Sequence, residues 1–418
     1  MVIGQGLLVA STPFLTRLYT PEDFGLFAVF GAFTSILVTM VALRYEYAIP
    51  LEQNERTALA LVSATGLLSL AFSLLLCPVV LVWGPSLAQL LGLPALTPLL
   101  WLLPPCLLLW GLGSALGFWS VRQGTFRLNG ASRIIHHGTQ AGGQLGFGLM
   151  GTGSAGLVVG YALGYLARFV HLAVALPRAE LRQFFRPSLG EIGQVLRRHW
   201  RFPAFATSAA ALHAASAMLP TVGIAMLYGP AMAGLYGLAQ RVVALPLRLV
   251  GESASEVFLG EIRNVDHDGL IRLFKRTTAL FTGLGLAGLL PLFWLAPWVF
   301  AFVFGEAWRE AGIIVQLLAP LYLARFVANP ISQTLNALDR QDLHLLSSLL
   351  GCLTPLLSFA VGWWLMLDAA WTIGLYSVSS SMVFIFMIAI AWWSLKRTDL
   401  QSLRRAETSI PADAKSTS

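Results

Sequence analysis

The sequence predicts an all-α integral membrane protein with about twelve transmembrane helices, arranged as two pseudo-twofold-related six-helix bundles around a central cavity. Composition, apolar runs of spanning length and a motif that recurs half a chain later predict this class. Of the 418 residues, 56% are hydrophobic and 11% are charged, and the mean hydropathy is +0.72. Soluble domains carry about 25% charged residues. The composition therefore excludes a soluble globule, a disordered chain, a nucleic-acid-binding protein and a secreted disulfide scaffold.

The apolar runs set the predicted spans. A hydrocarbon core about 30 Å thick needs about 20 apolar residues per helix. Runs of about this length lie at residues 1–18, 24–43, 58–83, 97–119, 134–151, 155–176, 203–227, 232–257, 277–304, 311–332, 345–367 and 371–393. Turn-forming residues separate them, for example Tyr19-Thr20-Pro21-Glu22-Asp23 and Tyr228-Gly229-Pro230. On the sixth span, glycines at 156, 160 and 164 predict close helix packing.

The chain opens directly into its first span. No basic lead-in and no small-residue cleavage site is present, so the segment does not have the pattern of a removable signal peptide. We expect a truncated first helix or a mis-assigned start codon. The predicted domains are an N-terminal bundle over 1–185, a C-terminal bundle over 186–395 and a polar cytoplasmic tail over 396–418.

Basic residues predict the orientation. The loops on the side of the 44–57 turn, together with the C-terminal tail, hold 21 of the 27 Lys and Arg residues, whereas the other side holds Arg309 and, at its border, Arg17. Basic residues collect on the cytoplasmic side. Both termini are therefore predicted to be cytoplasmic. The basic, amphipathic connection over about 177–202 is expected to lie on an anionic leaflet.

An internal repeat indicates duplication. Tyr19-x-Pro21-x-x-x-Gly25-Leu26-Phe27 recurs as Tyr228-x-Pro230-x-x-x-Gly234-Leu235-Tyr236, at an offset of 209 residues. Each copy follows the first span of a set of six. Because six is even, the two halves share an orientation and are related by an axis along the membrane normal, as in a two-bundle transporter with its substrate site between the halves.

Charged residues inside the spans mark the predicted site, because each costs on the order of 3 kcal/mol near the bilayer centre. On the eighth span these residues share one helical face: Arg241, Arg248, Glu252 and Glu256. The tenth span repeats the pattern with Arg325, Asn329, Ser332 and Asn336, and the fifth carries His137, Gln140 and Gln144. These faces are expected to line a wet, cationic cavity between the bundles.

The alternative is that these polar residues only bond helices together, with Arg248 and Glu252 forming a local pair. For Glu256 and Arg168, near span ends, snorkelling to the interface is the favoured interpretation. For Arg241 and Arg325 we favour contact with a ligand, because they lie deeper and have no neighbouring carboxylate on the same helix. Arginine, unlike lysine, suits a phosphate that is bound in a bidentate manner. The candidate ion-coupling residues are Glu46, Glu252 and Glu256. No nucleotide loop, zinc motif or nucleophile elbow is found, so no cofactor or metal and no enzymatic activity are predicted.

The residues also resemble a known family. Leu15-Thr16-Arg17-Leu18-Tyr19-Thr20-Pro21-Glu22-Asp23-Phe24-Gly25, followed by Arg44-Tyr45-Glu46, is similar to the amino-terminal signature of bacterial polysaccharide-biosynthesis membrane proteins, the oligosaccharide-lipid flippases of O-antigen and capsule pathways. Residues 239–246 and 304–312 resemble the second half of that family. The resemblance implies the multidrug/oligosaccharidyl-lipid/polysaccharide exporter fold and ion-coupled alternating access. It places Arg17, Arg44 and Arg241 where related flippases have cavity arginines.

Three functions compete. The favoured one is a flippase that moves an undecaprenyl-diphosphate-linked oligosaccharide across the inner membrane for lipopolysaccharide O-antigen, capsule or exopolysaccharide synthesis. Its partners are the lipid-linked oligosaccharide and membrane lipids, with polysaccharide polymerase and chain-length proteins as further candidates and no nucleic acid. A drug/cation antiporter of the same superfamily would need buried carboxylates, whereas the deep residues are mostly arginine. A membrane glycosyltransferase or polymerase would need a large outward loop, and none of the outward loops is longer than about 15 residues.

Overall fold

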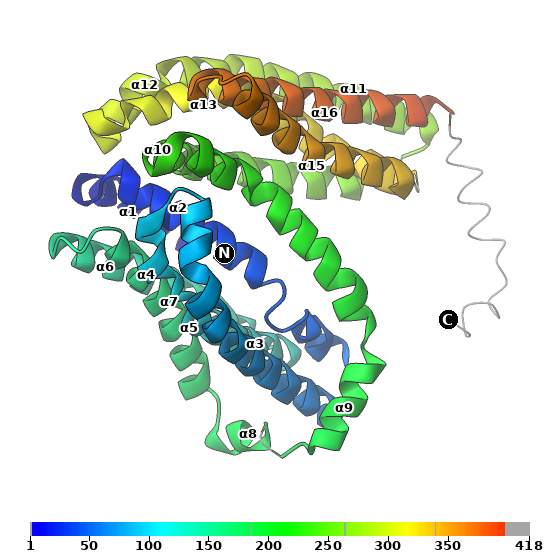
Figure 1. Ribbon diagram of the computed structural model, residues 1–418. Helices are drawn as coiled ribbons and strands as arrows, with labels where there is room; N and C mark the ends of the chain where they lie inside the picture. The colour runs from blue at the N-terminus through cyan, green and yellow to red at the C-terminus, as the bar shows by residue number, and fades with distance from the viewer. Residues whose placement is uncertain (1, 185, 263–264, 339, 398–418) are drawn as a thin grey trace. The chain divides into compact units, whose positions relative to one another are not determined.

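The computed structural model describes residues 2–184, 186–262, 265–338 and 340–397, and within these ranges every regular element is a helix (Figure 1). The α-helices, in chain order, are α1 (Val2–Leu18), α2 (Pro21–Leu37), α3 (Glu55–Leu90), α4 (Thr97–Leu100), α5 (Leu103–Arg122), α6 (Phe126–Leu149), α7 (Ser154–Ala175), α8 (Arg178–Gln183), α9 (Leu189–Arg198), α10 (Ser208–Ile262), α11 (His267–Leu284), α12 (Leu290–Phe304), α13 (Arg309–Ile331), α14 (Gln333–Ala337), α15 (Gln341–Trp364) and α16 (Ala369–Arg397). Short 3-10 or π-helical turns are η1 (Tyr45–Leu51), η2 (Pro94–Leu96), η3 (Phe202–Thr207), η4 (Gly285–Leu289) and η5 (Glu306–Trp308).

Each of the twelve predicted spans overlaps a helix. By length and composition, seven of the described helical stretches can cross a membrane: Glu55–Leu90, Leu103–Arg122, Ser154–Ala175, Phe202–Val243, His267–Phe304, Glu306–Leu335 and Ala369–Arg397. Helices α1 and α2, with 17 residues each, fall just short of the usual length of about 20. The second predicted span was too long, because helix α2 ends at Leu37 and turns follow it.

The chain divides into two compact units, one of Met1–Leu238 with Ala301–Trp308 and one of Ala239–Phe300 with Arg309–Ser418. The boundary falls inside α10, which contributes residues to both units. The bundles expected over 1–185 and 186–395 stay a prediction. Residues 398–418 of the expected tail lie outside the described part of the chain.

Helix starts in the first unit follow the predicted turn chemistry. The Thr20 hydroxyl accepts a hydrogen bond from the Asp23 backbone N–H, the Asp23 carboxylate accepts one from Thr20 N–H, and Pro21 begins α2. This capping box, with proline at the first helical position, fixes where α2 begins. The other predicted break is a kink inside α10, where Gly229 has a φ of 84°. A side chain at that φ would be strained, which explains the glycine.

Helices α6 and α7 pack closely in the first unit. A Cβ atom at Gly160 would lie 2.7 Å from the backbone nitrogen of Gln144, and one at Gly164 would lie 2.8 Å from the carbonyl oxygen of His136. The predicted role of these glycines in close helix packing is confirmed. A second core of this unit surrounds the fully buried Trp119, whose indole N–H donates to Glu180 of α8 at 3.2 Å.

The second unit packs α11, α13 and α16 together through aromatic side chains. Phe281 of α11 and Phe326 of α13 have ring centroids 5.0 Å apart. The carboxylate of Asp266 caps α11 by accepting from the Gly269 N–H at 2.8 Å.

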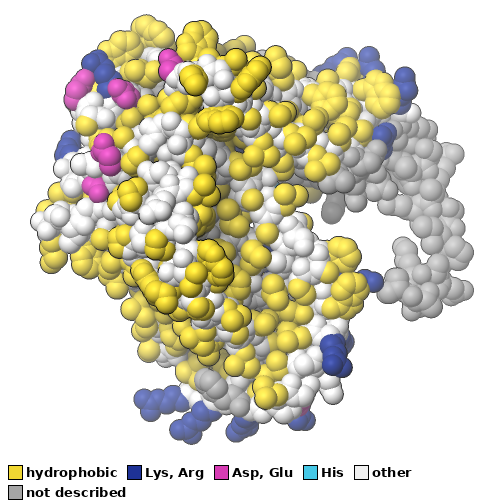
Figure 2. All heavy atoms as spheres, in the orientation of Figure 1, with side chains coloured by type: hydrophobic (Ala, Val, Ile, Leu, Met, Phe, Trp, Pro, Cys, Tyr) yellow, Lys and Arg dark blue, Asp and Glu magenta, His cyan; other side chains and the backbone are white. Residues whose placement is uncertain are grey.

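On the face drawn in Figure 2, hydrophobic side chains cover most of the visible surface and the charged side chains gather toward its edges. Such a surface suits lipid and not water.

Candidate functional site

The two repeated turns contact each other. A Cβ atom at Gly25 would lie 1.7 Å from the carbonyl oxygen of Pro230, and one at Gly234 would lie 1.9 Å from the carbonyl oxygen of Pro21. Both distances are far below any real carbon–oxygen contact, so only glycine permits the approach. Each copy of the motif thus presents its glycine to the proline of the other copy. This exchange is what a twofold relation between equivalent segments produces.

Aromatic side chains surround this contact, which we call the motif junction (residues 16–25, 230–234 and 304–308). The indole N–H of Trp308 donates to the carbonyl of Thr16 at 2.9 Å, and the Trp308 ring meets Phe24 edge-on with centroids 4.9 Å apart. The Tyr19 hydroxyl donates to the carbonyl of Gln144 at 2.6 Å. Burial, with a smaller contribution from Asp23, raises the pKa of Tyr19 to about 12, so the phenol keeps its proton. Three separate sequence motifs therefore converge in one cluster.

A buried polar seam runs between α6 and α7. Its described members include His136, Gln140, Gln144, Tyr161, Tyr165 and Arg168. The hydroxyls of Tyr161 and Tyr165 lie 2.7 Å apart, and the His136 ring lies 4.6 Å from the Tyr165 ring. Gln144 is fully buried and donates to the Leu157 carbonyl at 2.9 Å. The prediction that the fifth span presents Gln140 and Gln144 to a wet cavity was wrong, because close helix packing buries both amides.

The turn after α2 carries a buried acid. Leu43 and Arg44 have left-handed backbone angles, with φ of 51° and 63°, and η1 follows. Glu46 is 1% exposed, and neither of its carboxylate oxygens has a hydrogen-bond partner in the described part of the chain. Burial raises the pKa of Glu46 to about 7, against the opposing effect of Arg44. The half-buried Arg44 donates to the Tyr47 hydroxyl and covers its ring at 4.8 Å. Glu46 can therefore take up and release a proton near neutral pH.

The basic connection over 177–202 lies on the protein. Ile192 and Val195 of α9 are buried in the first unit, and the Tyr45 hydroxyl donates to the Leu196 carbonyl at 2.9 Å. Arg56 pairs with Glu191 at 2.6 Å. The apolar face of α9 therefore packs against protein, which corrects the expectation that it rests on a leaflet. Phe184 is also buried, Leu189 is exposed, and Phe185 lies outside the described residues.

In the second unit, α13 contacts α10 through Asn329, a predicted residue, and on α10 through Gly251 and Ser255, which were not predicted. The Ser255 hydroxyl bonds to the Asn329 carbonyl at 3.2 Å, and the Asn329 amide nitrogen would lie 2.9 Å from a Cβ at Gly251. Arg325 is exposed one turn before Asn329, and Arg241 of α10 is half-buried. Among the described residues, neither arginine forms an ion pair with a carboxylate. Each guanidinium group is of the kind that binds a phosphate.

The remaining candidates fall elsewhere. Glu256 is exposed, while the side chains of Arg248, Glu252 and Asn336 lie outside the described part. Arg17 is exposed at the end of α1, and Arg44 follows the far end of α2. A 17-residue helix is about 25 Å long, so these two arginines are not brought together.

Sequence reasoning missed several residues of these clusters. Trp308, Tyr161, Tyr165 and His136 were not among the candidates. A signal existed for the seam, because His136, Gln140 and Gln144 repeat every four residues on α6, as Tyr161 and Tyr165 do on α7.

The comparisons with known proteins decide the family. Residues 14–312 match the sequence profile of the family described as Polysaccharide biosynthesis protein (Polysacc_synt_3). The chain belongs to this polysaccharide biosynthesis family. It is also 27% identical over 164 residues to the lipopolysaccharide biosynthesis protein WzxC of Escherichia coli (strain K12), a match that covers 39% of this chain and 33% of WzxC. The chain thus spans about a third of the curated relative that it matches.

Two solved structures share the fold of this polysaccharide biosynthesis protein. The lipid II flippase MurJ in an inward closed conformation has a TM-score of 0.65 at 14% identity, covering 96% of this chain and 88% of MurJ. An inward-facing multidrug resistance MATE transporter of the MOP superfamily has a TM-score of 0.62 at 13% identity, covering 96% of each chain. These neighbours consist of two six-helix bundles, which confirms the predicted fold class. At such low identity the likeness concerns the fold alone.

Proposed function

We propose that this protein is a flippase that moves an undecaprenyl-diphosphate-linked oligosaccharide from the inner to the outer leaflet of a bacterial inner membrane. The observation that carries the proposal is the pair of arginines on α10 and α13, Arg241 and Arg325, which lack a carboxylate partner among the described residues. A diphosphate supplies the missing anion, while the prenyl chain stays in lipid. Membership of the polysaccharide biosynthesis family and the name of WzxC support this substrate class.

The experiment that tests the flippase is inactivation of the gene in its own host. Cells without the protein should accumulate unpolymerised lipid-linked repeat units and lose surface polysaccharide, and the wild-type chain should restore both. A polymerase would also leave single repeat units, but these would reach the outer leaflet and be open to glycosidases added outside intact cells. Accumulated units that external glycosidases digest would contradict the flippase.

The drug antiporter of the same fold remains the second candidate, and the charge of the second unit argues against it. A cationic drug requires buried carboxylates, whereas arginines occupy the predicted deep positions of α10 and α13. Glu256, the described acid of that face, is exposed. An anionic substrate is therefore the better match.

Proton coupling through Glu46 completes the proposal. With a pKa near 7, Glu46 changes its charge in the physiological range. Its folded pKa lies above the usual carboxyl value, so its neutral form is the one that the folded state favours. The contribution of Glu46 to the free energy of unfolding is fully present below about pH 4.5 and is lost as the pH rises through about 7. This change is on the order of 3 kcal/mol.

Replacing Glu46 with Gln should therefore flatten the pH dependence of stability. Thermal unfolding in detergent between pH 4 and 9 would show the wild type losing stability toward neutral pH more steeply than the variant. The exposed Glu55 provides the control, because Glu55→Gln should leave the profile unchanged. If the unfolding temperature depended on pH equally in the wild type and in Glu46→Gln, Glu46 would be excluded as the titrating group.

Topology offers an independent test, because both termini are proposed to be cytoplasmic. Cysteines introduced at the exposed positions Glu22 and Glu306 should react with a membrane-impermeant thiol reagent in intact cells. A cysteine at the exposed Asn54 should react only after the membrane is permeabilised. Labelling of Asn54→Cys in sealed cells would contradict the proposed orientation and indicate the opposite one.

A further inference from the structure

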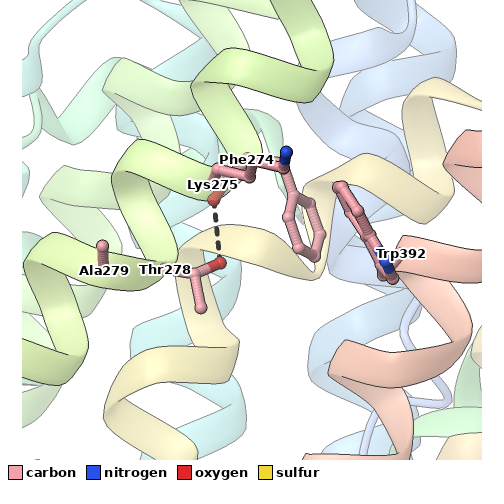
Figure 3. Close-up of a pocket in the computed structure, with 5 residues that line it drawn as sticks. All are labelled: Phe274, Lys275, Thr278, Ala279 and Trp392. Atoms are coloured by element: carbon pink, nitrogen blue, oxygen red, sulfur yellow. Dashed lines mark hydrogen bonds between the residues drawn. The ribbon is translucent and has the colours of Figure 1, made fainter.

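A shallow groove lies between α11 and α16 in the second unit. It has a volume of about 250 Å³ and is lined by Phe274, Lys275, Thr278, Ala279 and Trp392 (Figure 3). The Phe274 and Trp392 rings lie beside each other with centroids 5.4 Å apart. The Thr278 hydroxyl donates to the Phe274 carbonyl at 2.8 Å, so its one donor is already used within the helix. The wall of this groove, which we call the Trp392 groove, is therefore apolar.

Two ammonium groups stand over the same indole. The Nζ atoms of Lys275 and Lys396 lie 5.4 Å and 4.9 Å from the centroid of the Trp392 ring. Both side chains are exposed, and neither forms an ion pair with a carboxylate among the described residues. Like charges that share one ring repel each other, and an anion near both relieves that repulsion.

The groove also lies where a membrane meets water. Helix α11 starts with polar residues and becomes mostly apolar after Thr278, while Lys396 and Arg397 end the apolar α16. Leu280, which directly follows the groove residue Ala279, is 54% exposed, as a lipid-facing side chain is. Trp and Lys at the ends of apolar helices are typical of this interfacial depth.

We propose that the Trp392 groove binds an anionic phospholipid. The phosphate is held by Lys275 and Lys396, and the upper part of an acyl chain lies along Phe274, Ala279 and Trp392. The apolar wall argues against a soluble phosphate, and the two cations argue against a zwitterionic lipid. The volume is below the 300–1,000 Å³ of a typical small-molecule pocket, which fits one segment of a lipid better than an entire soluble ligand.

The test uses the full-length protein in detergent and phospholipids brominated on the acyl chain, which quench nearby tryptophans. Subtracting the signal of Trp392→Phe from that of the wild type isolates the quenching of Trp392. Brominated phosphatidylglycerol should quench this component at lower concentration than brominated phosphatidylcholine. Lys275→Gln and Lys396→Gln should each weaken the phosphatidylglycerol effect about fivefold, the factor expected for one basic residue near an anionic lipid surface.

Arg276→Gln is the matched control, because Arg276 is an exposed neighbour on α11 that does not line the groove. Its substitution should weaken the phosphatidylglycerol effect clearly less than either lysine substitution does, because Arg276 does not line the groove. Equal quenching by the two lipids, or unchanged affinity in both lysine variants, would overturn the proposal. The proposal would also be overturned if only a chain truncated after Arg397 showed the quenching, since the C-terminal segment would then be the occupant of the groove. Displacement of phosphatidylglycerol by equimolar undecaprenyl diphosphate would likewise overturn it. Retained lipid preference in the truncated chain, without such displacement, would support the phospholipid.

Discussion

Replacing Arg241 or Arg325 with alanine is expected to abolish surface polysaccharide while leaving the amount of protein in the membrane unchanged. The two residues lie on α10 and α13 of the second unit, and these helices contact each other through Ser255 and Asn329. A guanidinium group inside a span is tolerated when it meets water or an anion. On the proposed function, loss of one charge-assisted contact to the diphosphate, on the order of 1.5–3 kcal/mol, would slow transport at least tenfold. Surface polysaccharide and membrane abundance would be measured on the same cells.

Conservative variants separate binding from structure. Arg241→Lys keeps the charge without the bidentate fork and should retain partial function, whereas Arg241→Gln should not. Arg186→Ala, at an exposed position between α8 and α9, is the matched control and should export normally. If both residues only stabilise the fold, Gln would rescue as well as Lys, and loss of activity would follow loss of protein. Normal export by the double alanine variant would exclude both residues from the transport site.

Much of the fold could be predicted because local chemistry determines it. Apolar runs gave the spans, and the capping residues Thr20 and Asp23 gave the start of α2. The left-handed Gly229 gave the break in α10. The repeated glycines of α7 predicted its packing on α6, because a glycine stripe has few other uses in a membrane helix.

The site was less predictable because its contacts join residues far apart in the chain. The bond between Trp308 and Thr16 spans 292 positions, and no periodicity in the sequence encodes it. The polar face of a helix can also either line a water-filled cavity or pack against a neighbouring helix. For Gln144 the neighbour prevailed, because Gly160 lets α7 approach closely enough to bury the amide. Asn329 of the predicted α13 face does contact α10, but through Ser255, which was not among the predicted residues.

The motif junction yields the second large effect, since Gly25→Ala should impair transport strongly. A methyl group at residue 25 would lie 1.7 Å from the backbone carbonyl oxygen of Pro230, and a backbone atom cannot rotate away as a side chain can. The turns must separate, at a cost of about 1–3 kcal/mol or more. Because the contact belongs to the conformation described, the variant should populate it less and transport at least several-fold more slowly. Gly234→Ala should act alike, since its methyl group would meet Pro21 at 1.9 Å.

Gly31→Ala, on the same helix, is the matched control, because a Cβ atom there meets nothing within 4 Å. It should transport normally and unfold at a temperature no lower than that of the wild type. The double variant of Gly25 and Gly234 then distinguishes one shared contact from two separate ones. Once the first methyl group has separated the turns, the second methyl group meets open space. The double variant should therefore lose less stability than the sum of the losses of the two single variants, with a coupling free energy of about 0.5–3 kcal/mol. If the stability losses of the two single variants were strictly additive, or if Gly25→Ala kept wild-type stability and transport, the two repeat turns would not be in energetic contact.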